Sequence, residues 1–242
     1  MISVKNLTKY YGDFQALKGI SFEIKSGEIV GILGPNGAGK STTLRILTCY
    51  FNPTSGDAII DGKSILDEEN NVKKIIGYLP ESAPLYNDMC VFDYLVYMAD
   101  IQELERSKLN ERLHYVVNVC GLKEVISKPI GELSKGYKQR VGLAGAIIHD
   151  PKILILDEPT NGLDPNQIVE IRELIKELGK EKTVLVSTHI LSEVEDTCER
   201  ALIIDSGELI AEDTIEGLKT AMDREILGGN IELKVAGKVE DA

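Results

Sequence analysis

The sequence predicts an α/β fold with a mainly parallel central sheet, an N-terminal antiparallel β subdomain and an inserted α-helical subdomain. Apolar runs at 28–33, 152–156 and 183–187 predict strands that are buried on both faces, as in a parallel sheet. Short strand signals fill the first third of the chain, and helical patterns dominate from about residue 86 to residue 148. Strands that alternate with helices favour the α/β class.

The N-terminal third contains strand signals bounded by turn residues. We expect strands at Ile2–Leu7, Ile20–Ile24 and Ala58–Asp61, and glycines or Ser-Gly pairs separate the segments of this region. These strands are assigned to the antiparallel subdomain. The nearly continuous apolar run at 28–33 is assigned to the central sheet instead.

The insert at about 86–148 has little strand signal. Val91, Tyr94, Leu95 and Met98 recur at the spacing of one helix face. A stripe of this kind is more often a subdomain core than a cofactor site. Further helices are expected at 112–120 and 137–148, a core strand at 75–79 before the insert, and an amphipathic helix at 165–178 after the strand at 152–156.

Composition and charge restrict the classes of function. Lys and Arg number 27 against 39 Asp and Glu, a net charge of −12, and 43% of the residues are hydrophobic. This acidic balance argues against wholesale nucleic-acid binding. No apolar run approaches the roughly 20 residues needed to cross a bilayer, and the N-terminus lacks a secretory pattern. The four scattered cysteines predict reduced structural thiols.

A phosphate-binding loop stands out at residues 34–42, where GPNGAGKST matches G-x-x-x-x-G-K-[ST] between a predicted strand and a predicted helix. The glycines let the backbone wrap an anion, amide groups and the helix N-terminus donate to phosphates, and Lys40 adds a positive charge. The pattern predicts a P-loop NTPase core. The expected nucleotide-binding residues in it are Gly34, Pro35, Asn36, Gly37, Ala38, Gly39, Lys40, Ser41 and Thr42.

Two carboxylates follow the strand at 152–156. A buried strand delivers Asp157 and Glu158 to its carboxyl end beside the phosphate loop, where Asp157 would anchor Mg²⁺ and Glu158 would act as general base on the attacking water. A lone Asp-Glu pair is often a solvated strand end, but the P-loop makes the functional interpretation the stronger one.

Three further segments bear on the subclass. Ser134 is placed as the cap of a helix that begins LSKGY, and Gly136 permits close approach of an anion. Asp164 is placed as the cap of the next helix, and His189 directly follows the strand at 183–187. Taken singly, the first segment is equally an ordinary capped helix and the second a simple turn. A lone histidine after a strand is more often structural than functional.

Together these residues resemble the ATP-binding subunit of ABC transporters, from about residue 2 to residue 211. GPNGAGKS is similar to the Walker A motif of that family, ILILDE to Walker B, LSKGY to the signature, NGLD to the D-loop and His189 to the switch histidine. The resemblance implies that Tyr11 stacks on adenine. It also implies residues 1–211 as an ABC-type ATP-binding domain, with 212–242 as a C-terminal tail or small appendage, either a short hairpin or a frayed end.

The resemblance implies a head-to-tail dimer that sandwiches ATP. Ser134, Lys135 and Gly136 would contact the γ-phosphate held by the second copy, and Asp164 would lie at the dimer interface. Two departures from the family pattern stand out: LSKGY in place of LSGGQ, and Glu81 in place of the Q-loop glutamine. A carboxylate can still ligate Mg²⁺, so the expected metal ligands are Ser41, Glu81 and Asp157.

The implied function is ATP hydrolysis that powers a membrane transporter of the exporter type. ATP and Mg²⁺ would be the cofactors. The implied partner is an integral membrane permease encoded as a separate chain, which would place the protein peripherally at the cytoplasmic face; a groove near Tyr86 and Met89 is expected to receive it. The alternative is a soluble ABC-type ATPase acting on ribosomes or DNA, whose usual second ATP domain, long coiled coil or basic arms are not found in this sequence. A GTPase would need an N-K-x-D loop, and none is found.

Overall fold

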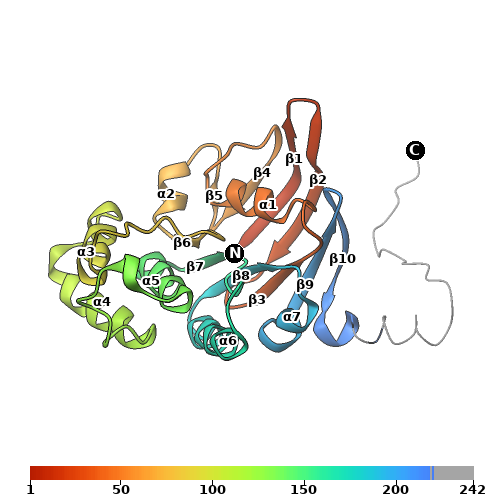
Figure 1. The fold of residues 1–242 in the computed structure, drawn as a ribbon. Coiled ribbons are helices and arrows are strands. Elements are labelled where there is room, and N and C mark those ends of the chain that lie inside the picture. Colours follow the sequence, from red (N-terminus) through yellow and green to blue (C-terminus); the bar gives the residue numbers. More distant parts are fainter. Residues whose placement is uncertain (219, 221–242) are drawn as a thin grey trace, which may run out of the picture.

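The computed structural model describes residues 1–218 and 220, which form two sheets flanked by helices (Figure 1). The smaller sheet is antiparallel, with strand order β2-β1-β4-β5. Its strands are β1 (Ile2–Tyr11), β2 (Phe14–Ile24), β4 (Ser55–Ile60) and β5 (Lys63–Ser64). The predicted antiparallel subdomain is therefore confirmed, although β1 and β2 are longer than expected and join in a hairpin at residues 12 and 13.

The larger sheet has the order β10-β9-β3-β8-β7-β6, and all of its neighbouring pairs are parallel except β10 with β9. Every residue of β7 and β8 is buried, as the apolar runs predict. The sequence analysis assigned no definite structure to the segment after Gly207. In the structure this segment forms β10, which pairs with β9, a strand that was not predicted. The strands are β3 (Ile29–Leu33), β6 (Ile76–Leu79), β7 (Ile153–Asp157), β8 (Thr183–Thr188), β9 (Arg200–Asp205) and β10 (Glu208–Thr214).

Helices cover the sheets and form a separate lobe, which holds α3 and α4 (Figure 1). The helices are α1 (Lys40–Leu47), α2 (Glu69–Lys73), α3 (Val91–Ile101), α4 (Arg106–Val119), α5 (Lys135–Ile147), α6 (Pro165–Gly179) and α7 (Leu191–Thr197), with a 3-10 turn η1 (Ile130–Glu132). The helix expected to begin at Arg112 begins at Arg106 instead. Most of the expected tail, 212–242, lies outside the described residues.

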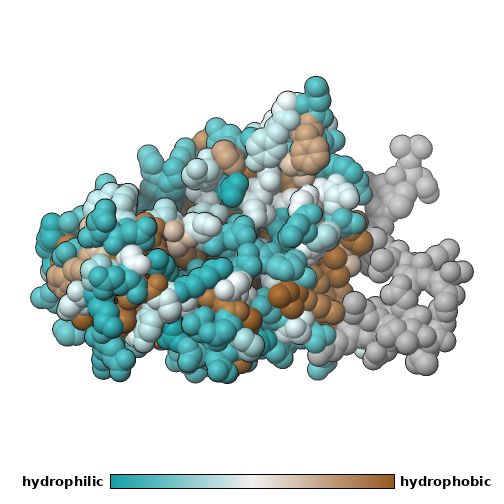
Figure 2. Space-filling model, in the orientation of Figure 1, coloured by the Kyte–Doolittle hydropathy of each residue, from teal (hydrophilic) through white to brown (hydrophobic). Residues whose placement is uncertain are grey.

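Two hydrophobic clusters meet at the central sheet. One joins the helical lobe to α6 and one face of the sheet, and the other joins α1 and the small sheet to the opposite face. The predicted stripe on α3 packs into the first cluster, with Val91, Tyr94 and Leu95 buried. Hydrophilic side chains cover most of the face in Figure 2. No helix among the described residues is long and apolar enough to cross a membrane.

His149 ties the end of α5 to the edge strand β6. Its Nε2 donates to the carbonyl oxygen of Ile76 at 3.1 Å, because a carbonyl only accepts, and its Nδ1 has no partner among the described residues. Burial lowers the pKa of His149 from 6.5 to about 4. The imidazole is therefore neutral in the folded chain at neutral pH.

This histidine should make stability fall in acid. Between pH 6.5 and 4 the unfolded chain binds a proton at this position that the folded chain does not, so the free energy of unfolding decreases as pH falls through that window. The contribution is on the order of 3 kcal/mol. Urea unfolding at several pH values should show a shallower pH slope in His149→Gln than in wild type. His114→Gln, at an exposed position, is the control for loss of an imidazole; equal slopes in wild type and His149→Gln would contradict the prediction.

Candidate nucleotide-binding site

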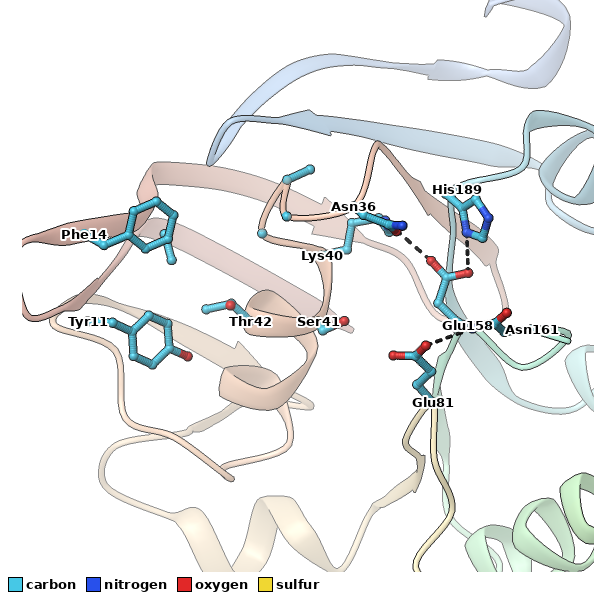
Figure 3. A pocket seen from close by; sticks show the side chains of 14 residues that line it. Tyr11, Phe14, Asn36, Lys40, Ser41, Thr42, Glu81, Glu158, Asn161 and His189 are labelled. Atoms are coloured by element: carbon cyan, nitrogen blue, oxygen red, sulfur yellow. Dashed lines mark hydrogen bonds and ion pairs between the residues drawn. The ribbon is translucent and has the colours of Figure 1, made fainter.

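A cavity of about 560 Å³ opens where the phosphate loop meets the ends of β7 and β8. Figure 3 shows aromatic side chains at one end of it and charged side chains at the other. The small sheet supplies the aromatic end, and the central sheet supplies the charged end. Its lining comprises Tyr11, Phe14, Ala16, Asn36, Gly37, Ala38, Gly39, Lys40, Ser41, Thr42, Glu81, Glu158, Asn161 and His189.

The loop at 34–42 connects β3 to α1 with a backbone that side chains would obstruct. A Cβ on Gly34 would overlap the carbonyl oxygen of Ile204 in β9, so β3 and β9 can only pack here with glycine at this position. Gly39, the N-cap of α1, has φ 109°, in the left-handed region that favours glycine. The predicted loop therefore folds as expected, with the start of α1 facing the cavity.

Lys40 is the first residue of α1, and its side chain is buried against the loop. Its Nζ donates to the carbonyl oxygens of Gly34 at 2.7 Å and Pro35 at 3.1 Å, and lies 3.4 Å from Oε1 of Glu158. Both side chains of this ion pair are more than nine-tenths buried. Removing one partner of a buried ion pair destabilises the fold, because the other charge is then left buried and unpaired.

Glu158 is held between Lys40 and His189 (Figure 3). Its Oε2 lies 2.9 Å from Nδ1 of His189, and since a carboxylate only accepts, Nδ1 carries the proton of this bond. Glu158 has φ 48°, a backbone conformation that is uncommon for a residue with a side chain. Its backbone N–H donates to both the carbonyl and the hydroxyl oxygen of Ser187 in β8.

Asp157 is not among the residues that line the cavity and is completely buried. Its Oδ1 accepts from the hydroxyls of Ser41 at 3.0 Å and Ser187 at 2.6 Å. Its Oδ2 has no hydrogen-bond partner in the part of the chain that the structure describes. The register of the parallel strands, which places Asp157 opposite Ser187, brings these groups together. Ser187 was not predicted as a site residue.

Glu81 reaches the same cavity from the loop after β6. Its Oε1 accepts from Nδ2 of Asn161 at 2.8 Å. The bond links the loop that leads into the helical lobe to the loop that follows Glu158 (Figure 3). Asn161 was not predicted as a site residue either, although it stands in the NGLD motif.

The aromatic end contains one predicted residue and one that sequence reasoning missed. Tyr11 and Phe14 flank the β1–β2 turn, and both rings point to the cavity in Figure 3. Phe14 is 64% exposed, which leaves a large apolar surface open to the solvent. Exposed aromatic faces are suited to stacking on a base. The signal available in the sequence was the short spacing of two aromatic residues across one turn.

The signature residues Ser134, Lys135 and Gly136 and the D-loop Asp164 do not line this cavity. Ser134 and Asp164 are the N-caps of α5 and α6, accepting from the backbone N–H groups of Tyr137 and Gln167. Both predicted caps are confirmed.

A profile of the ABC transporter family matches residues 17–161, which include the phosphate loop, the signature and both strand-end carboxylates. The chain belongs to the ABC transporter family. It is an ATP-binding and ATP-hydrolysing subunit that powers a membrane transporter, as the resemblance implied. ABC ATP-binding subunits of this kind work with membrane permease partners and form dimers.

Relatives and solved structures agree with this assignment. The chain is 36% identical over its whole length to an uncharacterized ABC transporter ATP-binding protein, YxlF of Bacillus subtilis, covering 80% of that protein. It is 38% identical to the bacitracin transport ATP-binding protein BcrA of Bacillus licheniformis, over 90% of this chain and 71% of BcrA. The dimeric post-hydrolysis structure of the ATP-binding cassette MJ0796 with ADP and Pi matches with a TM-score of 0.79 at 30% identity, over 89% of this chain and 99% of that chain.

Proposed function

We propose that the chain is the ATPase subunit of an exporter, in which two copies bind a separate permease at the cytoplasmic face of the membrane. The Lys40–Glu158–His189 arrangement around the cavity supports the ATPase part of this proposal, because it places a cation, a carboxylate and an imidazole where a terminal phosphate would lie. The similarity to BcrA, named for bacitracin transport, supports a role in transport. It favours transport over the alternative role on ribosomes or DNA.

In the proposed reaction the phosphates of ATP enter the loop at 34–42 and compete with Glu158 for the ammonium of Lys40. One carboxylate oxygen of Glu158 is thereby released, while His189 still binds the other. The free oxygen accepts a proton from a water molecule as that water attacks the γ-phosphorus, and the bond between the γ-phosphorus and the bridging oxygen of ADP breaks. His189 keeps the carboxylate oriented during this step.

Magnesium fits the residues beside the loop. Asp157 offers Oδ2, a buried oxygen without a partner among the described residues, and Ser41 offers its hydroxyl 3.0 Å from Oδ1. Oxygen ligands are those that Mg²⁺ prefers, and it is usually held by one or two protein groups together with phosphates and water. Bound there, Mg²⁺ would neutralise phosphate charge. Glu81, an exposed carboxylate on the same cavity, is the further ligand that we propose.

The proposed adenine contacts come from Tyr11, as the resemblance implied, and from Phe14 at the same end of the cavity. The remaining proposed contacts are made across a dimer. Ser134, Lys135 and Gly136 would reach the γ-phosphate at Lys40 of the partner subunit, with Asp164 at the interface. The MJ0796 structure is described as dimeric and supports this arrangement.

A groove on the side of the helical lobe is the proposed permease site. It encloses about 500 Å³, and its lining is mainly apolar: Arg45, Tyr50, Phe51, Tyr78, Leu79, Pro80, Ser82, Ala83, Pro84, Tyr94, Met98, Gly142 and Ala146. Tyr86 and Met89, near which the groove was expected, are not among the residues that line it. Met89 packs against the helical core, and the ring of Tyr86 packs edge-on against Tyr97 at 5.5 Å.

Charge placed in this groove should release the protein from membranes. Tyr50 and Ser82 are both exposed in the free subunit, so replacing both with Asp should leave the fold and ATP binding intact. In a complex with an apolar helix these carboxylates would be buried without partners. We expect the double variant to move to the soluble fraction of a cell lysate.

Leu66→Asp, at an exposed apolar position outside the groove, is the matched control and should stay with the membrane. Tyr86→Asp tests, in the same assay, whether the permease binds near Tyr86 instead, as the sequence analysis expected. Affinity purification of the wild-type complex from membranes should recover a multi-span permease that the Tyr50→Asp, Ser82→Asp variant fails to retain. Membrane association of that variant at the wild-type level would refute docking in this groove.

A further inference from the structure

Glu193 is a buried carboxylate outside the cavity that connects two loops of the site. It lies in the first turn of α7 and is 9% exposed. Its Oε1 accepts from the Thr160 hydroxyl at 2.8 Å, and its Oε2 accepts from the Thr188 hydroxyl at 2.6 Å. Thr160 lies two residues after Glu158, and Thr188 immediately precedes His189. One side chain therefore binds both backbone segments from which the Glu158–His189 pair projects.

The bonds around Glu193 are shielded from water. Thr160 is 5% exposed and Thr188 is 2% exposed. The Thr188 hydroxyl also accepts from the backbone N–H of Ile190 at 3.1 Å. The residues before and after His189 are therefore linked to each other by a hydrogen bond. Hydrogen bonds to a carboxylate are roughly twice as strong as those between neutral groups. Moving either loop would leave a buried carboxylate oxygen without its donor, which is unfavourable.

Helix α7 is itself anchored to the central sheet. It packs against β3, β8 and α6. Val194, next to Glu193, lies so close to Gly31 of β3 that a Cβ on that glycine would come within 2.7 Å of Val194 Cγ1. The carboxylate of Glu193 therefore extends from an element that has little freedom to shift relative to the strands bearing the site.

The Glu158–His189 pair needs such support. Glu158 sits at φ 48°, a conformation that persists only where its surroundings hold it. The 2.9 Å bond between Oε2 and Nδ1 joins residues from two different strand ends, so its length depends on how the two loops are placed. A misplacement of about 1 Å in an active site can reduce the rate on the order of 100-fold.

We propose that Glu193 is a positioning residue for ATP hydrolysis, its carboxylate holding the loops after β7 and β8 so that Glu158 and His189 stay in hydrogen-bond contact. It acts without touching the nucleotide. The inference rests on the proposed function, in which Glu158 is the general base. Loss of Glu193 should slow hydrolysis by disturbing the Glu158–His189 pair and leave ATP binding largely unaffected.

The first test compares Glu193→Ala with Glu193→Gln. Alanine removes both acceptors, and kcat per bound ATP should fall about 10- to 100-fold, with Kd for ATP changed less than about threefold. Glutamine keeps the size, accepts from one threonine and donates to the other hydroxyl oxygen, so it should restore most of the rate. Ser192→Ala, at an exposed position in the same turn, is the control and should match wild type.

A double-mutant cycle separates positioning from a general loss of stability. If Glu193 acts through the pair, Glu193→Ala should reduce kcat little further in a His189→Ala background. Thr188→Val and Thr160→Val each remove one of the two hydrogen bonds to Glu193 with little change in side-chain size, and each should reduce kcat by less than Glu193→Ala does. These two variants keep the test valid if Glu193→Ala folds poorly. Losses that multiply in the cycle, or wild-type kcat in both valine variants, would overturn the proposal.

The Glu158→Gln variant separates failure of the proposed ATPase mechanism from failure of the role assigned to Glu193. Wild-type hydrolysis in Glu158→Gln would overturn the base assignment, and this inference with it. Inactive Glu158→Gln together with wild-type kcat in Glu193→Ala would overturn this inference alone and leave the proposed function standing.

Discussion

Glu158→Gln should bind ATP but hydrolyse it at least about 100-fold more slowly than wild type, because general-base catalysis contributes on the order of 10²- to 10⁴-fold. The amide keeps the shape of the side chain and can still contact His189, but it cannot accept a proton from water. The loss of charge also removes the ion pair with Lys40, which frees the ammonium for phosphate. Single-turnover hydrolysis and equilibrium ATP binding, measured on the same preparation, check both halves of the prediction.

We also expect Glu158→Gln to form a dimer that depends on ATP. Light scattering with and without ATP should show dimers for Glu158→Gln and fewer for wild type, which consumes its ATP. Glu177→Gln, at an exposed position on α6, is the matched control for a carboxylate-to-amide change and should hydrolyse ATP normally. Normal turnover by Glu158→Gln would remove this residue from the base role.

Lys40→Ala should weaken ATP binding on the order of 100-fold or more, since hydrogen bonds to charged groups contribute about 1.5–3 kcal/mol each and Lys40 offers several. The affected charge is nine-tenths buried and lies inside the phosphate loop, where solvent screens it little. Isothermal titration calorimetry with MgATP measures the loss directly. An unchanged Kd would contradict the nucleotide-site assignment.

The same substitution leaves Glu158 buried without its cationic partner, so folding must be checked independently. Thermal unfolding of Lys40→Ala and of the double variant Lys40→Ala, Glu158→Gln separates the two effects. The double variant removes the unpaired charge, and it should recover stability lost by Lys40→Ala without recovering ATP affinity. Recovery of affinity together with stability would show that the single variant failed through misfolding.

Several features of the site were predictable because neighbouring residues determine them. The GPNGAGKST segment contains its own glycines, anion-facing amides and helix start, so its conformation follows from consecutive positions. Ser134 and Asp164 cap their helices through hydrogen bonds to residues three positions away. The apolar runs at β7 and β8 likewise predict full burial on both faces.

Other features depend on which strands become neighbours, and periodicity does not encode that order. The strand at β9 was missed, and with it the hairpin that places β10 at the sheet edge. A groove was expected near Tyr86 and Met89, and the residues that line the apolar groove beside the helical lobe could not be identified from the sequence pattern. Phe14 lines the cavity although it was not predicted to, because the β1–β2 hairpin extends beyond its predicted length.

The class of fold, the family, the phosphate loop and most of the residues that line the cavity were predictable from the sequence. The contacts between distant residues became visible in the fold alone: Lys40 with Glu158, Glu81 with Asn161, and Glu193 with the two loops. This difference follows from the range of the forces involved. Turn chemistry, caps and hydrophobic periodicity act between near neighbours in the chain, whereas these bonds require strand order and register to bring distant residues within about 3 Å.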